Sequence, residues 1–261
     1  MTCGTAYRSL PLLKMATMIL VRHGQASWFE ENYDRLSSLG ESQSRLLGEL
    51  WASRAVELTR VFTGPRVRQV RSAELCGEAF AAAGRKWPAP VVMDDLDEMR
   101  IEPLFREHLP ELFEKHAHLR ALSDSIVAAD GNEARARIFD RLFQGVVTMW
   151  VKGQIGAPGL ETWGNFRARV QRGLRAAQEF ETEGNLARAP SGRRVAVFTS
   201  AGVVVAATQL ALGLDDDKAL GLAWHMRNSS VSEFLFSDER FSLLSFNSVP
   251  HLPEAQMITL R

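Results

Sequence analysis

The feature that most constrains the fold of this chain is a short apolar run that ends in an arginine, a histidine and a glycine. Residues 18–21 read Met-Ile-Leu-Val and are followed by Arg22, His23 and Gly24. Such a run is typical of a buried parallel strand, and in open α/β sheets ligands bind where these strands end. Gly24 lets the backbone turn sharply there. The pattern therefore predicts a strand that delivers His23 and Arg22 to the carboxyl edge of a sheet.

A histidine beside an arginine at a strand end suits one kind of chemistry. A neutral imidazole is a nucleophile, and a guanidinium binds anionic groups such as phosphates. His23 and Arg22 together therefore indicate nucleophilic attack on an anionic group. Because the same tripeptide also occurs by chance at ordinary turns, the other segments of the chain have to decide between the two interpretations.

Composition limits the partners and the compartment. The chain has 261 residues, 46% of them hydrophobic and 24% charged, as in an ordinary soluble globular protein. Because 31 basic residues balance 31 acidic ones, we expect no nucleic-acid or membrane partner. The two cysteines, Cys3 and Cys76, form neither a disulfide framework nor a zinc-binding spacing. We therefore expect a cytoplasmic protein without a metal.

The first residues are predicted to be separate from the folded part. Within residues 1–14 the apolar piece is short, is broken by Pro11 and lacks a strong basic lead, so a signal peptide is not expected. We predict a flexible tail over residues 1–14 and one domain over residues 15–261. No apolar run approaches the roughly 18 residues of a membrane span.

Strand and helix patterns alternate along most of the chain. Besides the first strand, strands are expected at residues 59–63, 91–93, 194–199, 231–236 and 241–246. Helical spacing of apolar residues appears from residue 39, over 66–83 and over 161–180. This alternation predicts an α/β fold with a doubly wound, mostly parallel central sheet flanked by helices. The last two strands are separated by Ser-Asp-Glu-Arg and are expected to pair antiparallel.

Residues 99–157 look like a helical insertion and not another strand–helix unit. The strongest pattern within them is a helix over residues 134–152 with an apolar stripe. We expect the insertion to lie over the carboxyl ends of the strands and to roof the site.

Polar residues also follow three other predicted strands. Arg68 lies in the first helical turn after residues 59–63, where a helix N-terminus adds its own attraction for an anion, whereas Arg66 is expected to be solvated. Ser200 follows residues 194–199. Residues 94–98 are rich in Asp and Glu, but they lack a histidine or further oxygen ligands at a recognisable spacing, so a metal site is not expected.

Four segments together resemble the histidine phosphatase superfamily, the phosphoglycerate-mutase-like enzymes. Residues 20–24 (Leu-Val-Arg-His-Gly) carry the family's Arg-His-Gly after the first strand. Three further segments are similar to its Ser-Pro-Leu-x-Arg, Leu-x-Glu and Val-x-Ser-His-Gly-Gly stretches, respectively residues 63–68 (Thr-Gly-Pro-Arg-Val-Arg), 96–98 (Leu-Asp-Glu) and 197–202 (Val-Phe-Thr-Ser-Ala-Gly). The segments occur in the family's order, and the resemblance extends from about residue 18 to residue 252.

The resemblance implies a role for each residue. The family's histidine becomes phosphorylated, which falls on His23, and its glutamate is the proton donor, which points to Glu98. The predicted substrate-binding residues are Arg22, Arg68, Ser200 and Gln25. A nucleophile, guanidinium groups and a carboxylic acid suffice to cleave a phosphomonoester, so no cofactor and no metal are expected.

The chain departs from the family at Ser200, which stands where the second catalytic histidine belongs. A hydroxyl can donate one hydrogen bond to a phosphate oxygen but cannot carry the charge of an imidazolium. We expect a phosphomonoesterase with reduced activity on a small phosphorylated metabolite. The alternatives are a phospho-ligand-binding protein of the same fold, a mutase, and a serine hydrolase with Ser200 as nucleophile. The last lacks the glycine that a nucleophile elbow needs two residues earlier, where Phe198 stands.

Overall fold

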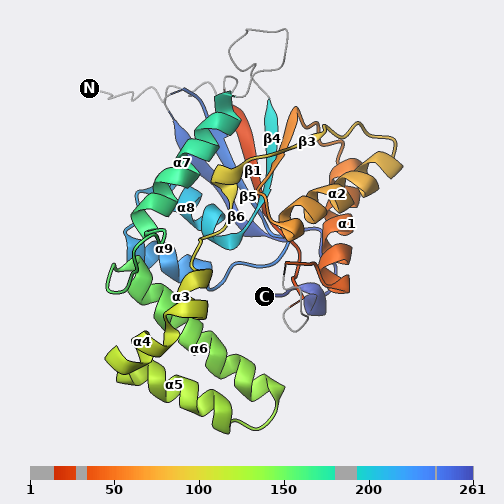
Figure 1. Cartoon of the computed structure of the whole chain (residues 1–261). Helices are drawn as coiled ribbons and strands as arrows, with labels where there is room; N and C mark the ends of the chain where they lie inside the picture. The colour runs from red at the N-terminus through yellow and green to blue at the C-terminus, as the bar shows by residue number, and fades with distance from the viewer. Residues whose placement is uncertain (1–14, 28–33, 180–192, 239, 261) are drawn as a thin grey trace, which may run out of the picture.

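A computed structural model describes residues 15–27, 34–179, 193–238 and 240–260 of the chain, so the tail predicted over residues 1–14 lies outside the described residues. The described part is built around a mixed six-stranded sheet in the order β3-β2-β4-β1-β5-β6 (Figure 1). The strands are β1 (Ala16–Arg22), β2 (Arg60–Thr63), β3 (Pro90–Val92), β4 (Arg194–Thr199), β5 (Val231–Phe236) and β6 (Phe241–Ser248).

Strand β1 lies inside the sheet, between β4 and β5. It pairs parallel with β4, which pairs parallel with β2, and β2 pairs parallel with β3. On its other side β1 pairs antiparallel with β5, and β5 pairs antiparallel with β6. The α/β fold with a mostly parallel sheet is thus confirmed, as is the antiparallel pair predicted from the Ser-Asp-Glu-Arg turn.

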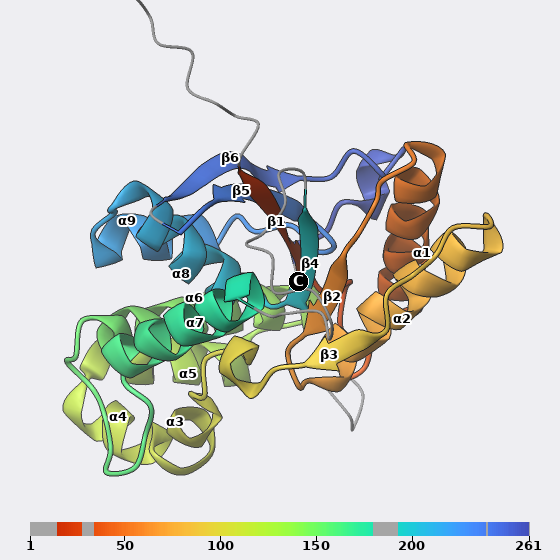
Figure 2. The same cartoon turned by 90° about the horizontal axis from the view of Figure 1, so that it is seen from above.

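Helices cover both faces of the sheet, and the alternation along β1 explains how (Figure 2). Ile19 and Val21 point into a core shared with α1 (Ser38–Ser53) and α2 (Val67–Ala82). Met18 and Leu20 point into a second core shared with α7 (Trp163–Glu179) and α8 (Ala201–Leu212). Successive side chains of a strand point to opposite faces. Because both faces of β1 are covered, all four side chains are buried.

Four helices follow the third strand and lie on the side toward which β1 and β4 run (Figure 1). These are α3 (Glu102–Glu107), α4 (Leu109–Lys115), α5 (Ala117–Ala128) and α6 (Asn132–Val151), and they are preceded by a 3₁₀ turn, η2 (Asp94–Leu96). The apolar stripe of α6, with Leu142, Val146 and Trp150, is buried in the same core as Met18 and Leu20. The helical region and the sheet therefore share one continuous apolar interior.

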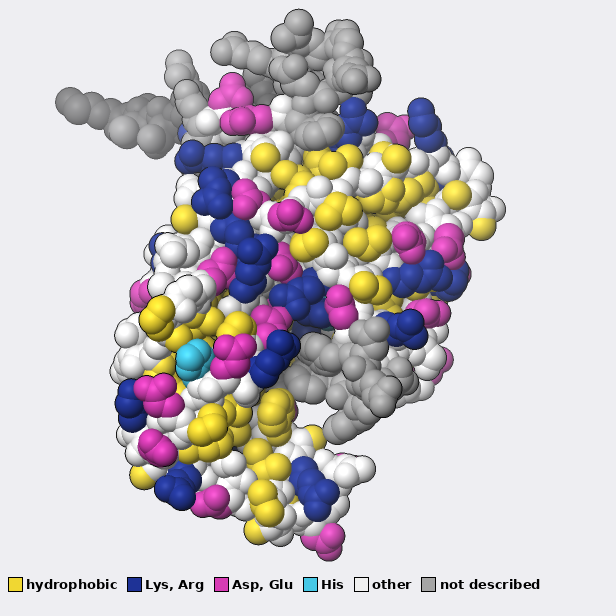
Figure 3. Space-filling view, viewed as in Figure 1, with side chains coloured by type: hydrophobic (Ala, Val, Ile, Leu, Met, Phe, Trp, Pro, Cys, Tyr) yellow, Lys and Arg dark blue, Asp and Glu magenta, His cyan; other side chains and the backbone are white. Residues whose placement is uncertain are grey.

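Helix α9 (Asp216–Ala223) follows α8 and lies beside it, and a second 3₁₀ turn, η3 (Ala255–Met257), follows β6. On the face drawn in Figure 3, basic and acidic side chains are interspersed, in keeping with the formal net charge of zero. Among the described residues, no helix is both long enough and apolar enough to cross a membrane.

The turn after β1 is fixed by a close approach of two backbone segments. A Cβ on Gly24 would lie 2.3 Å from the carbonyl oxygen of Gly40, and one on Gly40 would lie 2.1 Å from that of Gln25. Ser37 caps α1, because its hydroxyl accepts from the Gly40 amide at 3.0 Å and donates to the Gln25 side-chain oxygen at 2.8 Å. The start of α1 is therefore held against the turn that carries His23.

We expect Gly24→Ala to lower the free energy of unfolding by about 3 kcal/mol, because the new methyl group meets backbone atoms that cannot rotate away. Urea unfolding followed by circular dichroism measures the loss. The control is Gly221→Ala in α9, where a Cβ meets nothing within 4 Å and helix propensity favours alanine. Equal stability of the Gly24→Ala variant and wild type would contradict this account of the turn.

Candidate active site

His23 lies at the point where β1 ends, and its ring is held in one protonation state. Its backbone amide donates to the carbonyl of Thr199 at 2.8 Å, which continues the β1–β4 pairing by one step. Nδ1 lies 2.7 Å from the carbonyl oxygen of Gly24, and Nε2 lies 3.1 Å from Nε of Arg68. Because a carbonyl can only accept and a guanidinium can only donate, the proton belongs on Nδ1 and Nε2 presents its lone pair.

The surroundings keep the His23 imidazole neutral. Burial is the largest influence, followed by the positive charges of Arg68 and Arg22, and together they lower the pKa of His23 well below its ordinary value of 6.5. The side chain is 5% exposed. At neutral pH the ring is therefore an uncharged nucleophile with two cations close by.

Arg68 lies in the first turn of α2, as predicted, and is also buried. Besides His23 it contacts Asp34, with 2.7 Å between Nη1 and Oδ1. The other oxygen of Asp34 accepts from the backbone amide of Val67 at 3.0 Å. A carboxylate thus bridges a guanidinium and a helix N-terminus, which are the groups that bind anions elsewhere in proteins.

Arg22 and Gln25, the other predicted substrate-binding residues near β1, have structural contacts of their own. Nη1 of Arg22 donates to the carbonyl of Met226 and, at 2.8 Å, to that of Leu260. The side-chain oxygen of Gln25 accepts from the hydroxyl of Ser37. Both residues flank His23 in sequence, and their contact with substrate stays a prediction.

Ser200 follows β4, is fully buried and precedes the first turn of α8. Its hydroxyl oxygen accepts from Nε2 of Gln69 at 2.7 Å, and the oxygen of the same amide accepts from the backbone amide of Arg66 at 3.0 Å. Arg22 faces Thr199 in the β1–β4 register, so His23 and Ser200 are the next residues of two adjacent strands.

Glu98 reaches the same place from a distant part of the chain. A Cβ on Gly202, in the first turn of α8, would lie 2.3 Å from Oε1 of Glu98. The same oxygen accepts from the amide of Met99 at 3.0 Å. Because residue 202 is a glycine, the half-buried carboxyl group of Glu98 can occupy the space beside it. Gly202 is two residues from Ser200, so Glu98 lies close to the ends of β1 and β4.

The segment that carries Glu98 is anchored by Arg169 of α7. Its Nη1 donates to the carbonyl oxygens of residues 94, 95 and 97, at 3.4, 3.2 and 3.0 Å, and its Nη2 donates to that of Glu98 at 3.1 Å. Glu161 binds the same guanidinium through both carboxylate oxygens, at 2.7 and 2.9 Å. Arg169 is 6% exposed, so an irregular segment is held by one buried cation.

The expectation that Arg66 is solvated is wrong. Its Nε lies 2.6 Å from Oδ1 of Asp97, its Nη1 lies 2.6 Å from Oε1 of Glu102, and its side chain is 21% exposed. Asp97 also pairs with Nε of Arg100 at 3.2 Å. The acidic residues after β3 thus form ion pairs with arginines. Asp97 has two such partners, Arg66 and Arg100, whereas no ion pair of Glu98 is found among the described residues.

Sequence reasoning did not identify Gln69, Asp34 or Arg169 as parts of this site. Arg169 offered a signal, because it lies on the apolar face of α7, three residues after Phe166 and next to Val170. A charged residue at such a position is buried only when it is paired. Gln69 and Asp34 carried no comparable signal.

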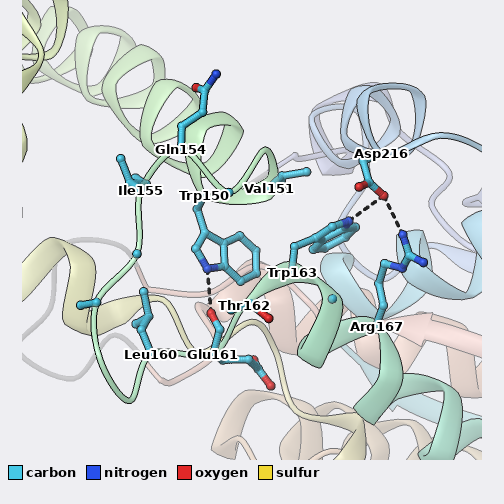
Figure 4. Close-up of a pocket in the computed structure, with 14 residues that line it drawn as sticks. Trp150, Val151, Gln154, Ile155, Leu160, Glu161, Thr162, Trp163, Arg167 and Asp216 are labelled. Carbon is cyan, nitrogen blue, oxygen red and sulfur yellow. Dashed lines mark hydrogen bonds and ion pairs between the residues drawn. The ribbon is translucent and has the colours of Figure 1, made fainter.

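A separate cavity of about 390 Å³ lies where α6 meets α7 and contains none of the predicted site residues (Figure 4). Trp150 and Trp163 form its apolar wall. Asp216 accepts from the indole of Trp163 at 2.9 Å and from Arg167 at 2.7 Å. Because these polar groups are paired with one another, we assign no chemistry to this cavity.

Comparison with known proteins identifies the family of the chain. Residues 18–149 and 140–249 match the family model of the histidine phosphatase superfamily (branch 1). A 2,3-bisphosphoglycerate-dependent phosphoglycerate mutase of Caulobacter vibrioides (strain NA1000 / CB15N) is 36% identical over 109 residues, which are 39% of this chain and 44% of that protein. The corresponding mutase of Caulobacter sp. (strain K31) is 33% identical over 28% of this chain and 35% of its own length. The chain thus spans less than half the length of these relatives.

Solved structures share the fold. Mycobacterial hydrolase 1 superposes with a TM-score of 0.61 at 17% identity, over 90% of this chain and 100% of that one. A mycobacterial glucosyl-3-phosphoglycerate phosphatase in complex with inorganic phosphate gives 0.60 at 17% identity, over 90% and 99%. At such identities the likeness shows the fold alone.

The hydrogen bonds from His23 to Ser229 and on to His251 yield a prediction about the pH dependence of stability. Ser229 donates its amide to the carbonyl of His23 at 3.1 Å, and its hydroxyl lies 2.8 Å from Nε2 of His251. Burial lowers the pKa of His251 from 6.5 to about 4. Between these values only the unfolded state takes up the proton, so this group's contribution to stability is present above pH 6.5 and is lost as the pH falls toward 4.

We expect His251→Gln to flatten the dependence of the unfolding free energy on pH. A shift of this size corresponds to about 3 kcal/mol lost by wild type between pH 6.5 and 4 through His251 alone. Urea unfolding across that range, with wild type and variant compared by slope and not by absolute stability, measures the difference. Parallel slopes would mean that His251 is not buried as a neutral ring.

Proposed function

The chain belongs to the histidine phosphatase superfamily (branch 1), and on that premise we propose that it is a phosphomonoesterase that acts on a small phosphorylated metabolite through a phosphohistidine. The observation that carries the proposal is the state of His23, whose proton lies on Nδ1 toward Gly24 while Nε2 presents a lone pair. Burial and two arginines keep the ring neutral at physiological pH. This is the state that a nucleophilic imidazole requires.

The first step forms a bond between Nε2 of His23 and phosphorus and breaks the bond from phosphorus to the ester oxygen. Arg68, which now donates to Nε2, turns its donors to the phosphate oxygens as charge develops on them. Glu98 gives its proton to the departing alkoxide, which leaves as an alcohol. The product of this step is phosphohistidine with an ionised Glu98.

The second step returns the protein to its starting state. Water attacks phosphorus, the ionised Glu98 takes a proton from it, and the phosphorus–nitrogen bond breaks. Inorganic phosphate leaves, His23 is again neutral and Glu98 is again protonated. Neither step needs a metal or an external cofactor.

We propose that Ser200 weakens this reaction without abolishing it. A neutral hydroxyl supplies less stabilisation to a transferring phosphoryl group than a positively charged imidazolium. If turnover is absent, the same pocket would serve as a binding site for phosphorylated ligands. The hydrogen bond that Ser200 receives comes from Gln69. Among the described residues no histidine is hydrogen-bonded to the hydroxyl, which speaks against a serine hydrolase.

We expect His23→Ala to lower kcat/KM for an aryl phosphomonoester by about 10³-fold or more, because the nucleophile is gone. Incubation of wild type with ³²P-labelled substrate and rapid quenching in alkali should trap a phosphoenzyme that is stable in base and lost in acid. The control is His118→Ala, an exposed histidine of α5. Turnover of His23→Ala close to wild type would remove His23 from the mechanism.

We expect Glu98→Gln to depend on the leaving group. Hydrolysis of an alkyl phosphate should slow by roughly 10²-fold or more, because its alkoxide needs a proton. Hydrolysis of a nitrophenyl phosphate should slow by less than about tenfold, since that leaving group departs without one. Steady-state kinetics on the two substrates measures the ratio. Equal slowing would assign the proton to another group, and Asp97→Asn would be measured next.

A further inference from the structure

The side-chain amide of Gln69 has an orientation that its neighbours determine. One end lies 3.0 Å from the backbone nitrogen of Arg66 and the other lies 2.7 Å from the hydroxyl of Ser200. A backbone N–H can only donate, so the end that faces Arg66 is the oxygen. The NH₂ group therefore faces Ser200, and Ser200 is the acceptor in that bond.

Because this bond uses the oxygen of the Ser200 hydroxyl as an acceptor, the hydroxyl proton is left to donate elsewhere. Serine at the start of a helix usually turns its oxygen toward the helix amides, but Ser200 makes no such cap bond with α8. Its oxygen accepts from Gln69, and within the described residues its proton is donated to no acceptor. Ser200 is fully buried, so this is a desolvated donor that lacks its acceptor, an arrangement that costs free energy in a folded protein.

The unused donor lies beside the nucleophile. The β1–β4 register, continued by the bond from the His23 amide to Thr199, makes His23 and Ser200 neighbours at the ends of adjacent strands. Arg68 reaches Nε2 of His23 from α2, and Gln69 is the next residue of that helix. A phosphate held at Nε2 of His23 would therefore present oxygens to both Arg68 and Ser200.

We propose that Gln69 is a positioning residue that aims the Ser200 hydroxyl proton at an oxygen of the transferring phosphate. This inference rests on the proposed function for the presence of a phosphate at His23. By occupying the lone pair of Ser200, the Gln69 amide leaves the hydroxyl only as a donor to the site. A serine whose rotation was unrestricted would spend part of its time as an acceptor, which repels a phosphate oxygen.

Helix capping alone does not account for Gln69. Its oxygen completes a capping arrangement with Arg66, and a Cβ on Gly64 would lie 2.2 Å from that oxygen, so the amide is closely packed. Capping uses only the oxygen. A glutamate of the same shape would cap equally well but would reverse the bond to Ser200, because a carboxylate can only accept. The two roles are therefore separable by one substitution.

The experiment is a double-mutant cycle of Gln69→Glu and Ser200→Ala, with kcat/KM for an aryl phosphomonoester and the affinity for inorganic phosphate as readouts. We expect Ser200→Ala to lower kcat/KM by about tenfold. Gln69→Glu should cost more, because it turns the hydroxyl proton away and adds a negative charge. In the Ser200→Ala background the same substitution should cost about tenfold less, since only the charge effect remains.

Two further variants complete the test. Gln69→Met removes the donor without adding charge, and it should lower kcat/KM in wild type but not in the Ser200→Ala background; it also replaces Gln69→Glu if that variant does not fold. Gln178→Glu, in the last turn of α7, adds the same charge elsewhere and should leave both readouts unchanged. Thermal unfolding of each variant separates lost stability from lost positioning.

The outcomes distinguish this inference from the proposed function. Equal fold-losses for the Gln69 variants in both backgrounds, in a protein that turns over, would overturn the role of Gln69 alone. If wild type binds phosphate without turnover, the proposed reaction fails, and coupling in phosphate affinity still decides the role of Gln69. If wild type neither turns over nor binds phosphate, both are overturned.

Discussion

The structure depends on the parallel pairing of β1 with β4, which ends in the bond from the His23 amide to Thr199. That pairing buries both faces of β1 between two helical layers and brings the strand ends to one edge. His23 and Ser200 are then neighbours although their positions in the chain differ by 177. Helices α2 and α8 start at the same edge, so their first turns supply Arg68, Gln69 and the glycine against which Glu98 packs.

Most of the sheet could be predicted because its signals are local. The apolar run of β1, the run of β4 and the polar turn between β5 and β6 are each contained in a few consecutive residues. Helices α3, α5 and α9 were not predicted. They have 6, 12 and 8 residues, lengths at which isolated helices are marginal, so tertiary packing and not local sequence supports them.

The residues of the candidate site also fall into two groups, those that local sequence predicts and those that only the folded chain brings together. His23, Arg68 and Ser200 could be found because each follows a strand that the sequence marks clearly. For Arg169 the sequence indicates only a charged residue on an apolar helix face. Its role could not be predicted, because four of its hydrogen bonds go to backbone carbonyls more than 70 residues away, which no residue type marks. The error over Arg66 has the same origin, since its partners Asp97 and Glu102 come close only when the chain is folded.

The contacts of Arg169 have a consequence for how this protein can evolve. Glu98 and Glu161 border the helical region on either side, and both bind the same guanidinium. Helices α3 to α6 therefore form an insertion whose two ends are held together by Arg169. Because the entropy of closing a loop changes only slowly with its length, such an insertion can be lengthened or shortened without displacing the carboxyl group of Glu98. The helical region can therefore change in length or sequence while Glu98 keeps its place beside Gly202.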